Sequence, residues 1–238
     1  MKNQLILCAF STLLLGACAK VYKPPTAATP LFTEKNQIAL EGSFSRAGSN
    51  FSAAASLTPQ LAIMFNGQYN NGTQKESVID KQPASGRYGE FAVGYFKKVN
   101  DNFIFETYVG YGLGRLADGY KIIDLVHEES FKYNKVFLQP NFDLRTGMVD
   151  FIFTPRFAYV FGNYTGDLIP INEVVNPDVA QKITFFSAEP TLTIAAGNEK
   201  VKVFTQVGVN FNKYSVISSL YNVGIGAKFK FSTKRDKK

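Results

Sequence analysis

The sequence lacks the features that mark several large classes of protein. Its 238 residues include no Trp, a single His (His127) and only two Cys. One His excludes a metal cage built from several histidines, and two Cys cannot form the disulfide framework of a small secreted scaffold. No run approaches the 18 or so consecutive apolar residues of a membrane-spanning helix, so a helical membrane protein is not expected.

Aromatic residues, by contrast, are abundant. The chain has 22 Phe and 12 Tyr, which is too many for a disordered protein. The net charge is +7, but residues 228–238 alone hold six basic residues and one acidic residue. The rest of the chain is therefore close to neutral, which gives no support to a nucleic-acid partner. We expect residues 232–238 to form a basic periplasmic tail beside acidic phospholipid headgroups.

The first 17 residues have the layout of a secretory signal peptide. A basic start at Lys2 precedes the apolar stretch 5–15, and the sequence then reads Leu15-Gly16-Ala17-Cys18. These four residues resemble the bacterial lipobox, which implies cleavage before Cys18 and a covalent lipid, including palmitate, on its thiol. The alternative is an ordinary signal peptide with a chance Cys. Residues 18–36 contain three Pro and predict an acylated, extended tether. Apart from the lipid, no cofactor and no metal is expected.

From residue 37 onward, apolar and polar residues alternate with period two, which indicates strands with one apolar face. Segments 103–112, 149–161 and 201–211 show the pattern most clearly. Most predicted strands have 10–14 residues, the length that crosses a bilayer when tilted. The ten predicted strands are 37–46, 50–57, 60–70, 86–97, 102–114, 130–144, 149–161, 183–196, 200–211 and 218–231.

The connections between these strands alternate in length. Tight turns are predicted near residues 58, 98, 145 and 197, and longer loops at 71–85, 115–129 and 162–182. This layout predicts an all-β, antiparallel, up-and-down transmembrane β-barrel over residues 37–231, with eight to ten strands and ten preferred. We therefore expect a bacterial outer-membrane location. An even strand count places both termini on the short-turn, periplasmic side.

The polar face of the strands indicates which side faces the lipid. It carries about one charge per strand among Gly and hydroxyl residues, which suits the packed interior of a narrow barrel better than the outer surface of a soluble, lipocalin-like barrel. Charges in such a lumen must be paired. We predict an ion-pair network that fills the lumen, with a binding or catalytic site among Glu106, Arg156 and Glu189 as the alternative. The predicted network is Glu41, Glu90, Glu106, Asp150, Arg156, Glu189, Lys202 and Lys228.

Three prolines lie inside consecutive predicted strands, on the apolar face. Pro140, Pro155 and Pro190 each remove a backbone donor from a sheet. They predict either local bulges or a lateral seam through which a lipid chain could enter. A second catalytic alternative, a hydrolase, rests on His127 at the outer rim.

The mature sequence resembles the small outer-membrane β-barrel lipoproteins of the Bacteroidota. The resemblance is carried by Cys18-Ala19-Lys20-Val21-Tyr22-Lys23-Pro24-Pro25, by Pro30-Leu31-Phe32 and by Arg87-Tyr88-Gly89-Glu90-Phe91-Ala92-Val93-Gly94-Tyr95-Phe96. It implies the fold and the location, and it brings no catalytic residue.

Together these features predict a lipid-anchored outer-membrane barrel with a structural or binding role, and an enzyme is the less favoured expectation. The alternatives are an enzyme that modifies lipid or lipopolysaccharide, and a narrow passive channel. The expected partners are outer-membrane lipid, an extracellular or periplasmic protein, and the barrel assembly machinery. The barrel assembly machinery is expected because Phe231 resembles the C-terminal aromatic residue that this machinery recognises.

Overall fold

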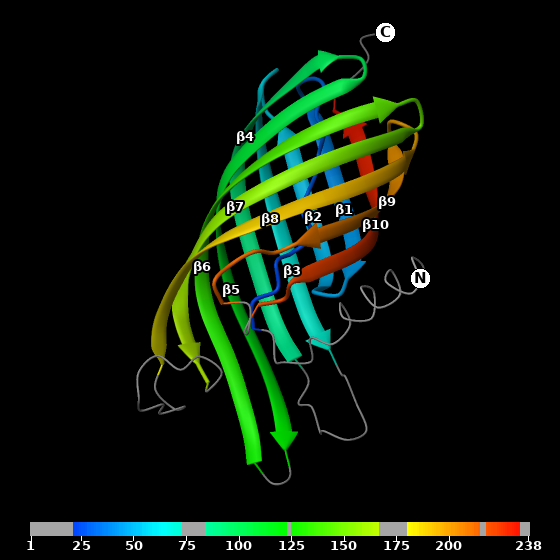
Figure 1. The fold of residues 1–238 in the computed structure, drawn as a ribbon. Helices are drawn as coiled ribbons and strands as arrows, with labels where there is room; N and C mark the ends of the chain where they lie inside the picture. Colours follow the sequence, from blue (N-terminus) through cyan, green and yellow to red (C-terminus); the bar gives the residue numbers. More distant parts are fainter. Residues whose placement is uncertain (1–20, 73–83, 123–124, 167–179, 215–217, 234–238) are drawn as a thin grey trace, which may run out of the picture.

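The computed structural model describes residues 21–72, 84–122, 125–166, 180–214 and 218–233. These residues form ten β-strands (Figure 1). The strands are β1 (Gln37–Ser45), β2 (Gly48–Ser56), β3 (Leu61–Gly72), β4 (Ala84–Asn100), β5 (Phe103–Ile122), β6 (Leu125–Thr146), β7 (Val149–Thr165), β8 (Gln181–Gly197), β9 (Val201–Val209) and β10 (Tyr221–Ser232).

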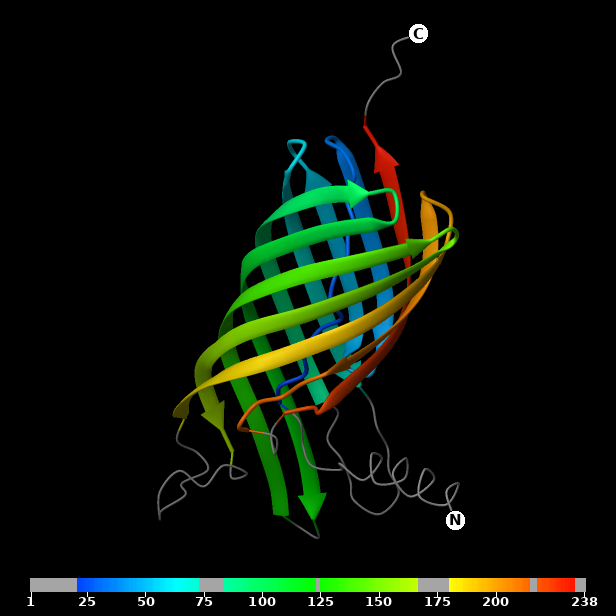
Figure 2. The ribbon, with the colours of Figure 1, turned by 45° about the horizontal axis from the view of Figure 1, so that its top comes forward.

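Every strand pairs antiparallel with its neighbour in the chain, and β1 pairs with β10. The sheet is therefore a closed up-and-down barrel without a free edge, as Figure 2 shows from a second direction. The predicted fold class and the preferred count of ten strands are confirmed. No helix among the described residues is long and apolar enough to cross a membrane.

The two ends of the barrel differ in their connections. At one end, named here the turn end, two to four residues join β2 to β3, β4 to β5, β6 to β7 and β8 to β9. The other five connections lie at the opposite end, the loop end. The prediction of a loop at 115–129 is wrong, because β5 and β6 stay paired out to Ile122 and Leu125. His127 consequently belongs to strand β6, and its side chain lies outside the described residues.

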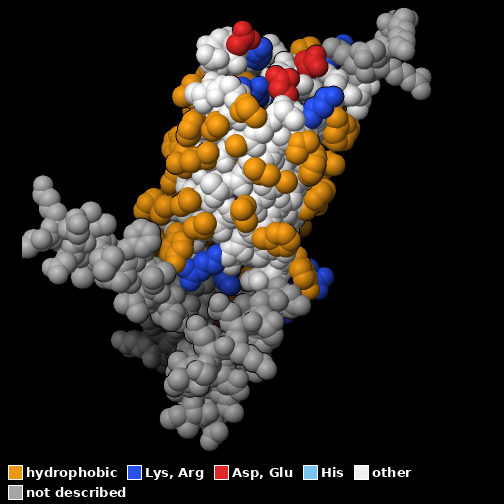
Figure 3. Space-filling model, turned by 90° about the vertical axis from the view of Figure 1, so that its right-hand side faces the viewer, with side chains coloured by type: hydrophobic (Ala, Val, Ile, Leu, Met, Phe, Trp, Pro, Cys, Tyr) orange, Lys and Arg blue, Asp and Glu red, His pale blue; other side chains and the backbone are white. Residues whose placement is uncertain are grey.

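The outer wall is apolar, as the alternation predicts. Phe44, Val109 and Phe186 are more than half exposed, and Figure 3 shows hydrophobic side chains over one face of the barrel between two charged ends. Inward positions are filled instead by buried polar and aromatic side chains. Gly112 and Gly114 on β5 leave the space that the rings of Tyr88 and Tyr133 occupy, since a Cβ at either glycine would overlap them.

Residues 21–36 run through the lumen from the loop end to the turn end, and we name them the plug (Figure 1, Figure 2). The sequence predicts a tether in this region. In the structure, residues 21–32 are an extended and largely buried chain within the barrel, and residues 34–36 are an exposed turn before β1. Val21 lies at the loop end, whereas Gln37, which opens β1, pairs with Ser232 at the turn end. The sequence predicts that the segment before β1 leaves the barrel at the turn end, whereas the described chain begins at the loop end. Residues 1–20, including Cys18, lie outside the described residues.

Candidate functional site

Aromatic rings hold the plug at the loop end of the lumen. Tyr22 is fully buried and packs edge-on against Tyr133 and Phe185, with ring centroids 5.3 Å apart in both pairs. Its hydroxyl donates a 2.5 Å hydrogen bond to Glu189 on β8. The carbonyl of Tyr22 accepts a bond from the backbone N–H of Ser219, which ties the plug to the segment between β9 and β10.

Side-chain amides of the barrel bind the backbone in the middle of the plug. The Gln206 amide both accepts from the N–H of Ala27 at 2.8 Å and donates to its carbonyl at 2.9 Å. Gln139 donates to the carbonyl of Ala28 at 2.7 Å. Buried backbone groups need such partners because water is excluded. The prolines of the plug reduce this need, since proline has no N–H to satisfy.

Charged side chains hold the plug at the turn end. The N–H of Thr29 donates to Glu41 at 3.1 Å, and the ammonium of Lys228 donates to the Thr29 hydroxyl at 2.7 Å. Lys228 and Glu41 face each other across the β1–β10 pair and form an ion pair at 3.4 Å. The N–H of Phe32 donates to Glu106 at 2.7 Å. Glu41 and Lys228 neutralise each other, and all three charged side chains satisfy hydrogen-bonding groups of the plug.

A second group of charges fills the lumen beside the centre of the plug. The guanidinium of Arg156 lies 3.0 Å from Glu90 and donates from Nε to Gln139 at 2.8 Å. The ammonium of Lys135 lies 3.7 Å from Glu90 and 3.8 Å from Glu189. Two acids and two bases thus balance in a fully buried cluster, which is the condition for keeping charges in a low-dielectric interior.

The charged residues predicted for the lumen belong to several separate groups of contacts. Asp150 pairs with Lys202 at 2.5 Å near the turn end. Glu106, in contrast, accepts from the plug and from Asn141. Glu106, Arg156 and Glu189, the candidate catalytic set, each have different partners within the chain. Sequence reasoning missed Lys135, although the alternation of β6 places it on the same face as Gln139 and Asn141.

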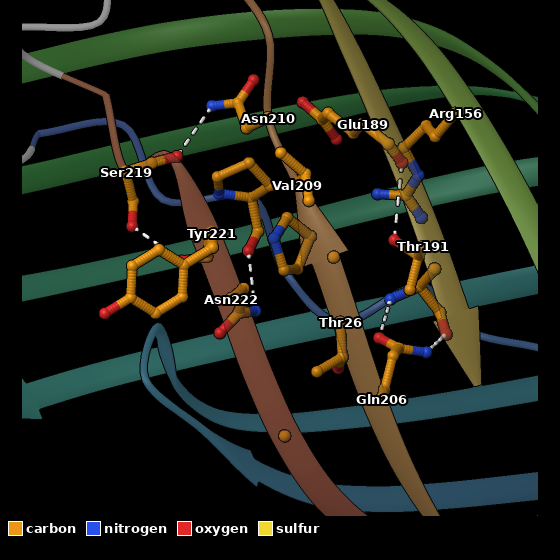
Figure 4. Close-up of a pocket in the computed structure, with 15 residues that line it drawn as sticks. Thr26, Arg156, Glu189, Thr191, Gln206, Val209, Asn210, Ser219, Tyr221 and Asn222 are labelled. Carbon is orange, nitrogen blue, oxygen red and sulfur yellow. Dashed lines mark hydrogen bonds between the residues drawn. The ribbon is translucent and has the colours of Figure 1, made fainter. Parts of the chain in front are cut away.

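A narrow cavity lies between the plug and strands β7, β8, β9 and β10 (Figure 4). Arg156, Glu189 and Gln206 line it from the wall, and Pro24 and Thr26 line it from the plug. All three wall residues already bind the plug or another lumen side chain. The cavity is therefore a crevice beside the plug, and a ligand larger than water must displace the plug to use it.

The three prolines lie in one row across neighbouring strands. Pro155 pairs with Pro190, and the register of β6 and β7 sets Pro140 opposite Pro155. The β6–β7 ladder has no paired residues between Leu138 and Phe142, yet its register does not shift. The structure thus has an interrupted ladder at the first two prolines in place of a bulge, because neither has an N–H to donate.

Side chains close this gap on the lumen side. Thr154 donates to Asn141 at 3.0 Å, and Arg156 donates to Gln139 at 2.8 Å, so two side-chain bonds join β6 and β7 where backbone bonds are missing. A lateral seam stays a prediction. In this geometry, a lipid chain that enters between β6 and β7 must break both side-chain bonds.

Neither a metal site nor a complete hydrolase site is visible in the part of the chain that the structure describes. No group of three or more metal-ligating side chains occurs among these residues. The Ser187 hydroxyl lies within hydrogen-bonding distance of two acceptors, Asn210 at 2.6 Å and Glu189 at 3.1 Å. These contacts supply a buried polar network without a histidine base. The described residues of the lumen therefore form no arrangement that supports the enzyme hypothesis.

Comparison with known proteins gives the fold. No protein-family model and no curated protein matches this sequence. Among solved structures, the outer membrane protease OmpT from Escherichia coli superposes with a TM-score of 0.51 at 12% identity, over 87% of this chain and 99% of that chain. The KdgM porin gives a TM-score of 0.32 at 9% identity, over 82% of this chain and 99% of that chain. The ten-stranded topology and the likeness to OmpT show that the chain has the fold of an outer-membrane β-barrel.

Proposed function

We propose that this protein is a lipid-anchored outer-membrane barrel, closed by its own N-terminal segment, with a structural or binding role at the loop end. The proposal includes membership of the small outer-membrane barrel lipoproteins of the Bacteroidota. The observation that carries it is the plug, which occupies the lumen that a channel or an internal enzyme site would need.

The contacts of the plug support a closed barrel at rest. The plug is bound near both ends and in the middle: Glu189 accepts from the Tyr22 hydroxyl, and Gln206 and Glu41 accept from backbone N–H groups. Each of these partners is a buried side chain of the wall. Leaving such groups without a partner is costly, so the plugged state is strongly favoured over an open one.

A conductance measurement tests this part of the proposal. We expect the full-length mature protein to give no steady single-channel currents in a planar bilayer. Current steps of uniform size in the intact protein would favour the passive channel instead. A porin of known conductance, incorporated in the same bilayers, shows that inserted channels are detected.

The path of the plug supports a position for the lipid that we propose on Cys18. Cys18 precedes Val21 by three residues, and an extended chain of that length spans about 11 Å. The anchor is therefore delivered to the loop end, which is the outer face when short turns are periplasmic. The proposal thus places the lipid in the outer leaflet, opposite the C-terminal end of β10.

Two experiments test the anchor. Metabolic labelling with a palmitate analogue is expected to mark the wild type and the Cys8→Ala control but not Cys18→Ala. For the leaflet, a protease site is inserted between Lys20 and Val21, and externally added protease should cut it in intact cells. A matched site after Thr233 should be cut only after the outer membrane is permeabilised. Labelling with protection of the first site would keep the anchor and overturn its location.

A further inference from the structure

A row of cationic side chains crosses the outer wall near the loop end. Arg87 on β4 pairs in register with Arg115 on β5, and Arg115 pairs with Lys132 on β6. The row continues through Asn163 on β7 to Lys182 on β8. All four cations are exposed, and the residues next to three of them, Tyr88, Leu116 and Tyr133, are buried in the lumen.

The arrangement is unfavourable for the protein alone. Like charges directly opposite each other on neighbouring strands destabilise a sheet, and here the contact occurs twice in succession. No carboxylate among the described residues forms an ion pair with Arg87, Arg115, Lys132 or Lys182. At the turn end the chain does supply such partners, since Lys98 pairs with Asp101 at 2.6 Å. Among the residues that the structure describes, the row therefore lacks the anion that its charge requires.

The position of the row indicates where that anion comes from. Two residues closer to the turn end on the same outer face lie Leu113 on β5, which is 57% exposed, and Asn134 on β6. From there the hydrophobic wall continues toward the turn end through the exposed side chains of Val109 on β5 and of Val136 and Leu138 on β6. The cations thus stand at the edge of the apolar band, at the level of lipid headgroups. Arg87, Arg115 and Lys132 also line one shallow groove, open to solvent, with about 1040 Å³ of empty volume.

We propose that this cationic row is a binding site for a membrane lipid that carries two or more phosphate groups. Neighbouring strands are about 4.8 Å apart, so three cations in register extend over roughly 10 Å. That length exceeds a single phosphate and fits a headgroup with several. Arg and Lys supply charge-assisted bonds to the phosphate oxygens. The acyl chains lie along Leu113 and the apolar wall beyond it. The inference needs only a membrane-spanning barrel and is independent of the lipid on Cys18.

The test compares lipids retained by the protein in nanodiscs, counted by native mass spectrometry. The discs contain phosphatidylcholine alone, or with added phosphatidylglycerol, or with added bisphosphorylated lipid A. The variant replaces three cations, Arg87→Gln, Arg115→Gln and Lys132→Gln. A matched control removes three exposed cations from the turn end, Lys97→Gln, Lys98→Gln and Lys200→Gln.

We expect lipid A to bind the wild type and the turn-end control equally, and phosphatidylglycerol to bind more weakly. A basic residue near an anionic membrane surface contributes about fivefold in affinity, so the triple variant should bind lipid A roughly 100-fold more weakly. Equal retention of lipid A by the triple variant and the control would overturn the proposal. Phosphatidylglycerol binding as tightly as lipid A would overturn the requirement for several phosphates.

A stability measurement keeps the test decisive if the triple variant folds poorly. Arg115→Gln alone removes the cation that has a like charge on both sides. In a zwitterionic detergent this variant should melt at the same temperature as the wild type or higher, because repulsion is removed. Adding lipid A should raise the melting temperature of the wild type more than that of the variant. Inorganic pyrophosphate producing the same rise would show that a soluble anion suffices and would overturn a lipid site.

Discussion

The two halves of the plug are held by different chemistry. In the turn-end half, Glu41, Glu106 and Lys228 bind backbone groups directly, so charge is used to satisfy the main chain. In the loop-end half, the ring of Tyr22 packs among aromatic side chains, and its hydroxyl contacts one carboxylate. Aromatic packing occurs in both halves, since Phe32 packs against Phe96, so among the described residues the two halves differ chiefly in that charged side chains bind the plug backbone directly only toward the turn end.

Deleting the plug removes the contacts of both halves, so it should have the largest effect on the free energy of unfolding. Deleting residues 22–33 leaves Glu41, Glu106 and Lys228 without their plug partners. Hydrogen bonds to charged groups contribute about 1.5–3 kcal/mol each, so the free energy of unfolding should fall by several of these increments. Ion conductance should appear at the same time. Denaturant unfolding and bilayer currents measure the two effects, with deletion of 234–238 as the control. A deletion that stays closed and stable would show that the plug is dispensable.

The turn-end half is tested by isolating one buried charge. Lys228→Met leaves the Glu41 carboxylate buried beside the plug without its cation. Removing one partner of a buried ion pair costs about 3–5 kcal/mol, which should appear as a lower free energy of unfolding. The double variant Glu41→Gln, Lys228→Met should regain part of this loss, because no lone charge remains. A double variant no more stable than Lys228→Met would contradict the importance of the pair.

The loop-end half is tested at Tyr22. Tyr22→Phe keeps the ring and removes the hydrogen bond to Glu189, which should cost about 1.5–3 kcal/mol. Tyr22→Leu also removes the two edge-on ring contacts, each contributing about 0.5–1.5 kcal/mol more. Unfolding free energies of both variants give the two increments separately. Equal losses for Phe and Leu would mean that the hydroxyl alone secures this half, and the contrast with the turn end would disappear.

Periodicity was enough to predict most of the wall but not the plug. Alternation placed Glu41 and Lys228 on the inward face, and closure of β1 on β10 brings them together. The plug has no such period, because its contacts run from its backbone to side chains on six strands. Its prolines indicate an extended chain and do not specify what surrounds it. The ends of β5 and β6 were missed for a related reason, since strands that continue past the apolar band have no lipid-facing residues to alternate.

The boundary between the two halves lies beside Arg156, where the proline row interrupts the wall, and here the smallest effect is expected. Pro140 faces Pro155 across the ladder gap, so Pro140→Val with Pro155→Val supplies two backbone donors at the interruption. Each restored bond contributes about 1 kcal/mol, and the valines suit a strand better than proline does. The free energy of unfolding should therefore rise by up to about 2 kcal/mol, and amide hydrogen exchange in β6 and β7 should slow. Pro190→Val, within β8, is the matched control that leaves the β6–β7 gap unchanged. If the double variant gains nothing while β6 and β7 exchange as before, the bonds from Thr154 and Arg156 already hold this part of the wall as tightly as a continuous ladder would.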